Sequence, residues 1–257
     1  MKKVLIVIPA HNEEKRIGQT LGEYLTFLKN LQNNKFDYEI IVVINNSNDK
    51  TEEIVKNFSR KDSRLRYLNL KQKGKGFAVI MGFIEAIKLK GDLIGFVDAD
   101  MATSPEEYYK LIKEINGFDG AIADRYLKDS KVFPPATFRR LIVGRAFNFL
   151  VRALLFIPYK DTQCGAKIFK REALEKTISS LSMSQWAFDV ELLYQLRKNG
   201  LRIKSVATKW IDREYSKINF LKAGPWMALG VIRLRILNSP IKKFIRLYDT
   251  MLGFVPK

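Results

Sequence analysis

The sequence predicts an α/β fold with a mostly parallel sheet. Short apolar runs that suit strands alternate with segments that suit helices through the first half of the chain. This alternation is typical of a parallel sheet with helices on both faces. The predicted strands are 4–8, 38–44, 65–70, 93–97 and 120–123. The predicted helices are 13–31, 51–59, 76–89 and 105–115.

The helix predicted at 105–115 has the clearest start signal. Ser104 suits the N-cap, Pro105 suits the first helical position, and Glu106 and Glu107 place negative charge in the first turn. The strand before this helix therefore ends within a few residues of a well-defined helix start.

Length and composition limit the class of protein. With 257 residues, 47% of them apolar, the chain makes one large or two small domains with a substantial core, which excludes a disordered protein. The single cysteine, Cys164, excludes a disulfide framework and a zinc cluster within one chain. Cys164 has no base near it in the sequence, so we do not expect a nucleophile. The apolar N-terminal run is short and is followed by a turn and acids, which indicates a buried first strand rather than a signal peptide.

The formal net charge of +18 is unevenly distributed along the chain. Residues 1–128 hold 21 basic and 18 acidic side chains, whereas residues 129–257 hold 24 and 9. The excess in the second half predicts that this half faces an anionic partner.

Two basic segments in the second half contain no acidic residue, namely 131–160 and 215–248. Each includes an apolar stretch that is shorter than the roughly 18–20 residues of a membrane-spanning helix. Helices of this kind suit a membrane surface, with the apolar face down and Lys and Arg toward anionic headgroups. The alternative is a pair of core helices with solvated basic edges.

Two carboxylates one residue apart, Asp98 and Asp100, follow the predicted strand 93–97. Ligands of parallel sheets bind at the carboxyl ends of strands. Converging carboxylates repel each other unless a cation lies between them, and hard oxygen ligands suit Mg²⁺ or Mn²⁺. The alternative to a metal site is that one of the two aspartates caps a helix and the other is an ordinary surface acid.

Four motifs carry a resemblance to a known family. They are DADMAT at 98–103, KDTQCGAKIF at 160–169, WAFDVELLY at 186–194 and W-x-D-x-x-x-S-K at 210–217. With VIPAHNEEKRI near the N-terminus, they make the chain resemble the family-2 glycosyltransferases of the GT-A fold over roughly residues 3–238. Within that family the chain looks most like the dolichyl-phosphate β-glucosyltransferases, and less like the dolichyl-phosphate mannosyltransferases.

The resemblance implies an enzyme that moves a hexose from a nucleotide sugar to polyprenyl phosphate at a membrane surface, with inversion of the anomeric carbon. The acceptor phosphate has a second pKa near 6, so it is largely an anionic nucleophile at neutral pH and needs no activating dyad. The enzyme then contributes positioning and stabilisation of the leaving diphosphate, with Mg²⁺ or Mn²⁺ on Asp98 and Asp100.

The resemblance also implies an organisation and a location. We expect a GT-A catalytic domain at 1–217, which includes a membrane-facing acceptor segment at 131–160, followed by basic interfacial helices at 218–257. The expected location is the cytoplasmic face of a membrane, with peripheral attachment and no transmembrane helix.

The residues expected at the donor follow from the family's motifs. Those expected to bind the nucleotide sugar are Pro9, His11, Glu13, Asn45, Lys75, Asp98, Ser216 and Lys217. Lys75 lies in a KGKG turn that opens a helix, where backbone N–H groups suit phosphate. Without the family context, His11 would be interpreted as a turn residue and each lysine as a solvated surface charge.

The remaining expected residues lie at the acceptor and the reacting centre. Arg125 matches a position near the donor and acceptor phosphates, and Arg140 a position that grips the acceptor phosphate, because a guanidinium binds phosphate bidentately. Asp189 is expected to project toward the sugar or the acceptor, so the expected catalytic set is Asp100, Asp189 and Arg125. Trp186 is expected to pack rather than to stack on the sugar.

The sequence departs from the family's pattern at several positions. Ile44 and Asn45 occupy the positions where the family's second strand usually ends in two acids, so these positions do not identify the base of the donor nucleotide. Ala102-Thr103 follows the glucosyltransferase branch and favours UDP-glucose over GDP-mannose. Gln185 replaces the arginine expected before WAFD, and Tyr215 replaces the glycine expected before Ser-Lys. Transfer from GDP-mannose or a UDP-N-acetylhexosamine therefore stays open.

Two other classes of function are weighed against this one. A nucleic-acid-binding protein is suggested by the basic pI of about 9.8. It is not favoured, because the basic residues lie next to long aliphatic runs rather than among exposed aromatics. A soluble nucleotidyltransferase or a protein glycosyltransferase would keep the fold but leave the two basic segments without a purpose.

Overall fold

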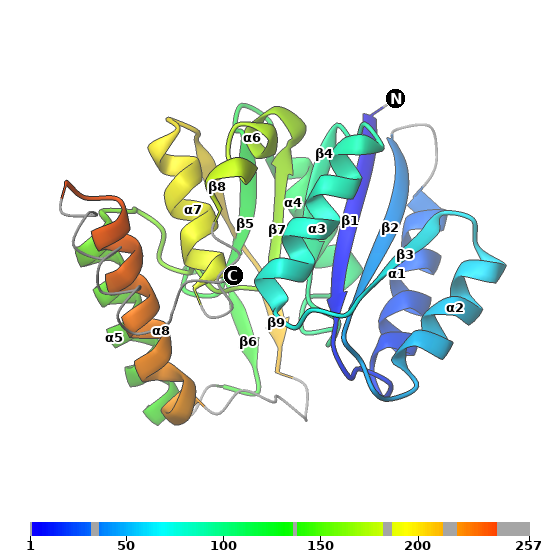
Figure 1. Cartoon of the computed structure of the whole chain (residues 1–257), viewed down its shortest axis with the longest axis horizontal. Helices are drawn as coiled ribbons and strands as arrows, with labels where there is room; N and C mark the ends of the chain where they lie inside the picture. The colour runs from blue at the N-terminus through cyan, green and yellow to red at the C-terminus, as the bar shows by residue number, and fades with distance from the viewer. Residues whose placement is uncertain (1, 32–35, 136–137, 182–186, 213–219, 241–257) are drawn as a thin grey trace.

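A seven-stranded sheet forms the centre of the molecule (Figure 1). The computed structural model describes residues 2–31, 36–135, 138–181, 187–212 and 220–240. The strand order is β3-β2-β1-β4-β7-β5-β8. The strands are β1 (Lys2–Ala10), β2 (Phe36–Asn45), β3 (Leu65–Leu70), β4 (Leu93–Val97), β5 (Gly120–Asp124), β7 (Ala166–Lys170) and β8 (Ile203–Ala207). The five predicted strands are confirmed, with β1 and β2 longer than predicted.

One strand, β7, runs against the direction of the others. It pairs antiparallel with β4 on one side and with β5 on the other, whereas the remaining neighbours are parallel. Val97, the last residue of β4, lies opposite Ala166, the first residue of β7. The reversal therefore places the loop before β7, residues 161–165, beside the two aspartates that follow β4.

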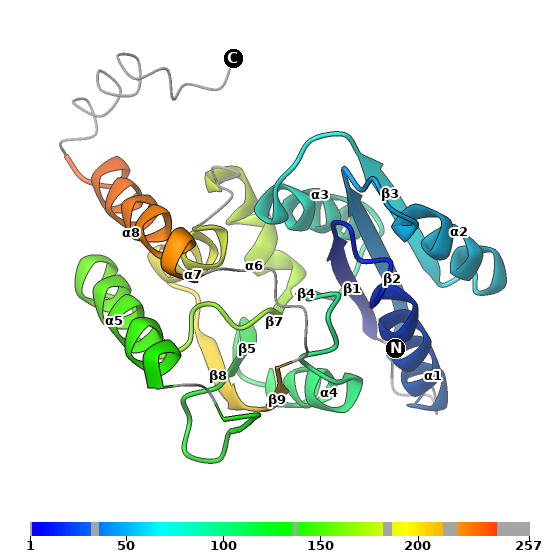
Figure 2. The same ribbon diagram turned by 90° about the horizontal axis from the view of Figure 1, so that it is seen from below.

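Helices cover both faces of the sheet (Figure 2). One layer holds α1 (Ile17–Leu31), α2 (Thr51–Lys61) and α4 (Pro105–Glu114); the other holds α3 (Lys75–Lys88), α6 (Arg171–Glu175) and α7 (Phe188–Lys198), with a 3-10 turn at Ile178–Ser180. Because both faces are covered, the central strands are mostly apolar, and β4 and β5 are buried at every residue.

Two of the predicted helix starts differ in detail. The segment predicted as a helix from Glu13 forms a turn first, and the helix begins at Ile17. Ser104 takes the extended N-cap conformation before Pro105, as predicted. Its hydroxyl, however, donates to the Glu106 carboxylate at 2.6 Å and makes no capping bond to the backbone.

Two further helices, α5 (Phe138–Leu155) and α8 (Phe220–Leu237), lie side by side next to α7 (Figures 1 and 2). Val231 and Leu234 of α8 join the same apolar core as α7. Two short parallel strands, β6 (Lys131–Phe133) and β9 (Lys209–Ile211), form a separate ribbon. Within the described residues, no helix combines the length and hydropathy needed to cross a membrane.

Candidate active site

The loop that carries Asp98 and Asp100 leaves the end of β4 and is held by helix α1. The buried hydroxyl of Thr20 donates to the carbonyl of Ala99 at 2.8 Å, and the buried hydroxyl of Tyr24 donates to the carbonyl of Thr103 at 2.9 Å. The apolar core thus contains two polar side chains that fix both ends of this loop. Fixed loops of this kind preorganise the groups that they carry.

The same loop is held from its other side by the β6–β9 ribbon. The N–H of Ile211 donates to the carbonyl of Ala102 at 2.9 Å, and Thr103 forms an isolated bridge with Trp210. Within the loop, Oδ1 of Asp100 accepts the N–H of Ala102 at 3.0 Å. The W-x-D motif that starts at Trp210 therefore supports the Asp98–Asp100 loop directly.

The backbone of Gly165 packs against the carboxylate of Asp98. The N–H of Asp98 donates to the carbonyl of Gly165 at 3.0 Å, and a Cβ added to Gly165 would lie only 1.8 Å from Oδ2 of Asp98. A glycine is therefore required here by close approach. Gly165 belongs to the KDTQCGAKIF motif at 160–169, and the structure places this residue in contact with Asp98.

A row of alternating charges crosses the site from β4 to α7. Nζ of Lys75, at the start of α3, lies 2.7 Å from Oδ1 of Asp98 and 3.8 Å from Oδ2 of Asp189. Asp189, in the first turn of α7, also pairs with Nζ of Lys167 on β7. The structure therefore brings together three of the predicted residues, Lys75, Asp98 and Asp189, which are far apart in the sequence.

The electrostatics of this row keep its lysine charged. Burial lowers the pKa of Lys75, but the carboxylates of Asp98 and Asp189 outweigh burial and raise it above its ordinary value. Burial raises the pKa of Asp98, Lys75 opposes this shift, and the nearby charge of Asp100 adds to it. A nearby like charge disfavours the ionised form of a carboxyl, and a cation between Asp98 and Asp100 would relieve that repulsion.

The oxygen donors at this edge fit a divalent cation. Asp98 and Asp100 supply hard oxygen ligands, which Mg²⁺ and Mn²⁺ prefer. Among the described residues, no group of three or more His, Cys, Asp and Glu side chains gathers around a common point. The remaining ligands would have to be water and substrate oxygens, which is the usual arrangement for Mg²⁺ at phosphate-binding sites.

The first predicted nucleotide loop interlocks with the loop after β2. Nδ1 of His11 lies 2.6 Å from the carbonyl oxygen of Asn45. The N–H of Glu13 donates to the hydroxyl of Thr51 at 2.7 Å, and the carboxylate of Glu13 pairs with Arg16. Glu13 thus contributes to the shape of the loop, and a contact of its side chain with a donor stays a prediction.

Asn45 ends β2 with an incompletely satisfied side chain. The residue is 4% exposed, and its Oδ1 has no hydrogen-bond partner among the described residues. A buried acceptor without a partner costs free energy, so native structures usually pair it with protein, water or ligand. Pro9, which was predicted at the same site, lies on the adjacent strand opposite Val43 and is partly buried.

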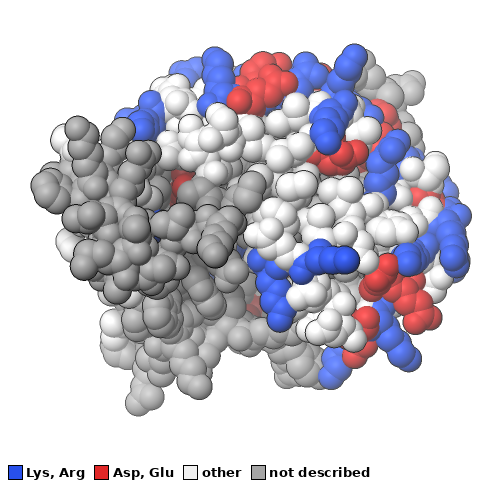
Figure 3. Space-filling view, in the orientation of Figure 1, with Lys and Arg blue, Asp and Glu red and all other residues white. Residues whose placement is uncertain are grey.

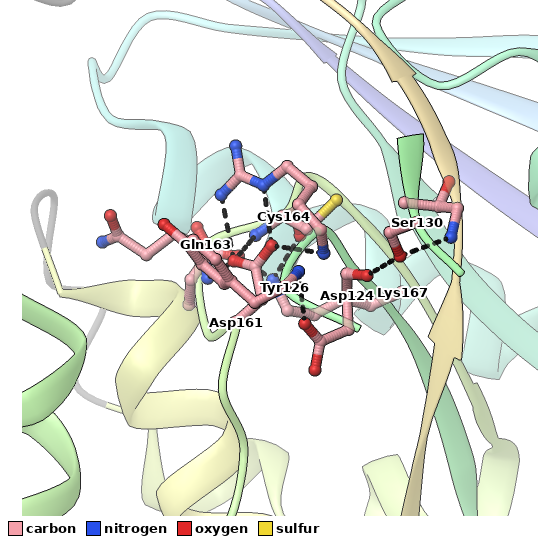
Figure 4. Close-up of polar contacts among 10 residues, drawn as sticks. Asp124, Tyr126, Ser130, Asp161, Gln163, Cys164 and Lys167 are labelled. Carbon is pink, nitrogen blue, oxygen red and sulfur yellow. Dashed lines mark hydrogen bonds and ion pairs between the residues drawn. The ribbon is translucent and has the colours of Figure 1, made fainter. Parts of the chain in front are cut away.

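Asp161 is fully buried and forms an ion pair with the partly buried Arg125, and Figure 4 shows the polar contacts around Asp161. Nε of Arg125 lies 2.7 Å from Oδ2 of Asp161, and one terminal nitrogen lies 2.9 Å from Oδ1. Asp161 also accepts the backbone N–H groups of Arg125, Gln163 and Cys164. Burial raises the pKa of Asp161, but Arg125 outweighs burial and holds it below its ordinary value.

The ion pair with Asp161 bears on the role of Arg125, and burial bears on the reactivity of Cys164. A guanidinium has five N–H donors, so engagement with one carboxylate is compatible with a phosphate contact by Arg125, which stays a prediction. Burial raises the pKa of Cys164 to about 12, so its thiol is protonated at neutral pH, in line with the expectation that it is no nucleophile.

Several predicted residues fall where the structure gives no side-chain account. Ser216, Lys217, Trp186, Gln185 and Tyr215 lie outside the described residues. Arg140 lies in the first turn of α5, but its side chain is also outside the described set. Their roles stay predictions.

Sequence reasoning missed two charged residues at the site, Asp161 and Lys167. Asp161 was not among the expected site residues, although it is fully buried and accepts five hydrogen bonds from three residues. Lys167 has no solvent exposure. The available signal was a charged residue within the apolar run AKIF, in a fold whose strands are covered on both faces.

Comparison with known proteins identifies the family. The model of the family described as "Glycosyl transferase family 2" matches residues 5–178. A human protein named dolichyl-phosphate beta-glucosyltransferase is 36% identical over 255 residues, which cover 93% of this chain and 77% of the relative. A Drosophila melanogaster protein of the same name is 35% identical and covers 88% and 71%.

Solved structures share the fold at lower identity. Glucosyl-3-phosphoglycerate synthase from Mycobacterium tuberculosis, in complex with Mn²⁺, UDP and glucosyl-3-phosphoglycerate, superposes with a TM-score of 0.64 at 20% identity and covers 91% of this chain and 79% of the other. A mannosyltransferase from Pyrobaculum calidifontis, in complex with GDP-Man and Mn²⁺, gives 0.59 at 18% identity and covers 95% and 64%. With the strand-end aspartates and the family match in agreement, the chain belongs to glycosyl transferase family 2 and is a glycosyltransferase of the GT-A fold.

Proposed function

We propose that this enzyme transfers glucose from UDP-glucose to dolichyl phosphate or another polyprenyl phosphate, with inversion of the anomeric carbon. The observation that carries the proposal is the 36% identity to the human dolichyl-phosphate beta-glucosyltransferase across almost the whole chain. Nucleic-acid binding and nucleotidyl transfer are not favoured by any of these relatives. On the face shown in Figure 3, basic side chains are interspersed with acidic ones, as on an ordinary solvated surface.

The proposed reaction depends more on charged groups held in place at the edge of the sheet than on a general base. An oxygen of the acceptor phosphate forms the new bond to the anomeric carbon while the bond to the nucleoside diphosphate breaks. Asp98 and Asp100 would hold Mg²⁺ or Mn²⁺, which when bound supplies positive charge beside the leaving diphosphate. Lys75, kept protonated by its two carboxylate neighbours, adds a second positive charge at the start of α3, where N–H groups also favour phosphate.

Asn45 is well placed to recognise the nucleoside. Its buried and unpartnered Oδ1 suits a hydrogen bond from a ribose hydroxyl or from a base N–H. His11, which lies against the Asn45 carbonyl, and Pro9 complete this end of the proposed donor site. Ser216 and Lys217 are proposed to close over the donor from the other end.

The acceptor phosphate is proposed to meet Arg125 and Arg140. Helix α5 approaches the segment after β5 closely, because a Cβ added to Gly144 would lie 2.9 Å from the hydroxyl of Tyr126, the neighbour of Arg125. Arg140 lies one helical turn before Gly144. The two arginines are therefore carried by adjoining segments, and together they suit a phosphate dianion.

Helices α5 and α8 are proposed to face the membrane. Exposed apolar side chains recur every seven residues along α5 and its end, at Ile142, Phe149 and Phe156, with exposed fractions of 52%, 74% and 74%. Leu229 and Ile232 of α8 are also exposed. Such a face beside basic residues suits an anionic membrane surface. Peripheral attachment at the cytoplasmic face, with 1–217 as catalytic domain and 218–257 as interfacial helices, stays part of this proposal.

Replacing both exposed phenylalanines, in Phe149→Ser/Phe156→Ser, is expected to weaken binding to anionic vesicles at least tenfold. Burying one phenylalanine contributes roughly 1.5–3 kcal/mol, and both side chains are now largely in water. Sedimentation with phosphatidylserine-containing vesicles measures the loss. Transfer to acceptor dispersed in detergent is the control and should stay within twofold of wild type; unchanged vesicle binding would contradict the membrane-facing assignment.

Gly165→Ala is expected to slow transfer by roughly ten- to a hundredfold with little loss of stability. The new Cβ must displace the Asp98 carboxylate, and misplacing a catalytic group by about 1 Å costs on that order. The rate and the thermal unfolding midpoint are measured together. Gly22→Ala in α1 is the matched control, because a Cβ there meets nothing within 4 Å. Full activity of Gly165→Ala would show that Asp98 need not lie where the structure has it.

A transfer assay tests the function itself. Radiolabelled UDP-glucose, GDP-mannose and UDP-N-acetylglucosamine are offered separately with polyprenyl phosphate in detergent, with Mg²⁺, with Mn²⁺ and with chelator. Metal-dependent label in the lipid phase from UDP-glucose is expected. Label from another donor would correct the sugar, and no lipid label from a folded enzyme would rule out the proposed acceptor.

A further inference from the structure

Lys167 is unusual because its charged side chain is completely buried in the central sheet. It is the second residue of β7, and its strand neighbours are Phe96 on β4 and Ile122 on β5. Lysine is almost never fully buried unless it is paired, because removing an ammonium from water is costly. A lysine retained here therefore needs partners within the protein.

The partners of Lys167 account for its charge and point toward the site. Its ammonium donates to the carbonyl of Cys164 at 2.7 Å, forms an ion pair with Oδ1 of Asp189, and lies 5.1 Å from the centre of the Phe96 ring. Since Lys167 has no solvent exposure, it cannot touch a donor or an acceptor itself. It can contribute to the reaction only through its partners, and of these Asp189 has a partly exposed side chain beside Lys75.

Asp189 is held so that its two oxygens differ. Oδ1 is taken up by Lys167 beneath it, whereas Oδ2 lies on the side of Lys75, 3.8 Å from Nζ. The Asp189 side chain is 15% exposed, so one edge of the carboxylate reaches the site. The ion pair therefore restrains the orientation of the carboxylate and leaves Oδ2, which is beyond hydrogen-bond distance of Lys75, with the greater capacity to accept a hydrogen bond.

We propose that Lys167 is the positioning residue for Asp189: it binds Oδ1 from beneath the sheet edge, so that Oδ2 accepts a hydroxyl of the donor hexose. The proposal rests on the transferase function proposed above, because it assigns the hexose rather than the nucleotide to Asp189. The alternative is that the ion pair only anchors α7 to the sheet.

A double-mutant cycle with Lys167→Met and Asp189→Asn tests the proposal. Each single variant is expected to lower kcat/KM for the nucleotide sugar at least tenfold, and the double variant to be no worse than Asp189→Asn alone, because Lys167 acts through Asp189. The Kd of UDP, which lacks the hexose, should stay within threefold in every variant. Lys170→Met is the matched control, since Lys170 ends the same strand with a partly exposed side chain that pairs with Asp119.

The outcomes separate positioning from anchoring. If Lys167→Met lowers the unfolding midpoint but leaves kcat/KM unchanged, the pair is only an anchor and the proposal fails. If Lys167→Met does not fold, the double variant still tests the role of Asp189, because it buries no unpaired charge. Transfer by the double variant at wild-type rates would overturn that role. If wild type transfers no sugar to lipid, the proposed function fails. The contact with the hexose would still be supported if wild type binds UDP-glucose more tightly than UDP and Lys167→Met abolishes that difference.

Discussion

Asp100→Asn is expected to lower the rate of sugar transfer roughly a hundredfold or more while leaving the free energy of unfolding almost unchanged. The substitution removes the negative charge that would help to hold a divalent cation beside the leaving diphosphate. An asparagine oxygen can still accept the N–H of Ala102, so the loop keeps its internal hydrogen bond. Thr20 and Tyr24 hold the loop through backbone carbonyls, which the change does not touch.

Initial rates at saturating Mn²⁺, together with urea unfolding, measure both parts of this expectation. Asp129→Asn is the matched control, because Asp129 is an exposed acid in the segment after β5 with no place in the proposed site. A fully active Asp100→Asn enzyme would remove Asp100 from the metal site. A variant that is inactive because it is unfolded would show instead that the acid supports the loop.

Asp161→Ala is expected to destabilise the fold by about 3–5 kcal/mol, the cost of breaking a buried ion pair by removing one partner. The carboxylate binds the Arg125 guanidinium and accepts three backbone N–H groups, all of which lose their acceptor together. The free energy of unfolding extrapolated from urea titrations measures the loss. Asp129→Ala serves as the exposed control, and a loss below about 1 kcal/mol for Asp161→Ala would contradict the assigned network.

The same pair predicts how stability depends on pH. The folded-state pKa of Asp161 is lower than its ordinary value, so the pair stabilises the protein fully above the unfolded pKa of about 4. The contribution is lost as the pH falls from there through the folded-state pKa. Urea midpoints from pH 7 to pH 3 should therefore fall more steeply for wild type than for Asp161→Asn, and parallel slopes would contradict the expectation.

Local sequence signals were sufficient for the first half of the fold. Each strand from 4–8 to 120–123 was an apolar run separated from the next by a helical segment, and each was confirmed. Strands β7 and β8 were not predicted. β7 is only five residues long and contains two lysines, and its place between β4 and β5 depends on pairings with residues about 50 to 75 positions earlier, which no local pattern records.

The candidate-site residues that could be predicted are those whose side-chain type and motif indicate a chemical role. Asp98, Asp100, Lys75 and Asp189 were expected at the site, and the structure places Lys75 beside Asp98 and Asp189, whose roles stay predictions. Lys167 was missed because a lysine in a strand is ordinarily read as a solvent-facing residue. Its burial follows from helices α3 and α7 covering that face, which is a tertiary property.

The reversed strand β7 also determines when the site can form as the chain is synthesised. Strands β1 to β4 can pair once residue 97 has left the ribosome, but the free edge of β4 waits for residues 166–170. β5 precedes β7 in the sequence yet joins the sheet only through it, and β8 in turn pairs with β5. Asp98 can meet Gly165, and Lys167 can meet Asp189, only after residues 165 and 189 have been synthesised. We therefore expect strands β1 to β4 to pair before the active site is complete.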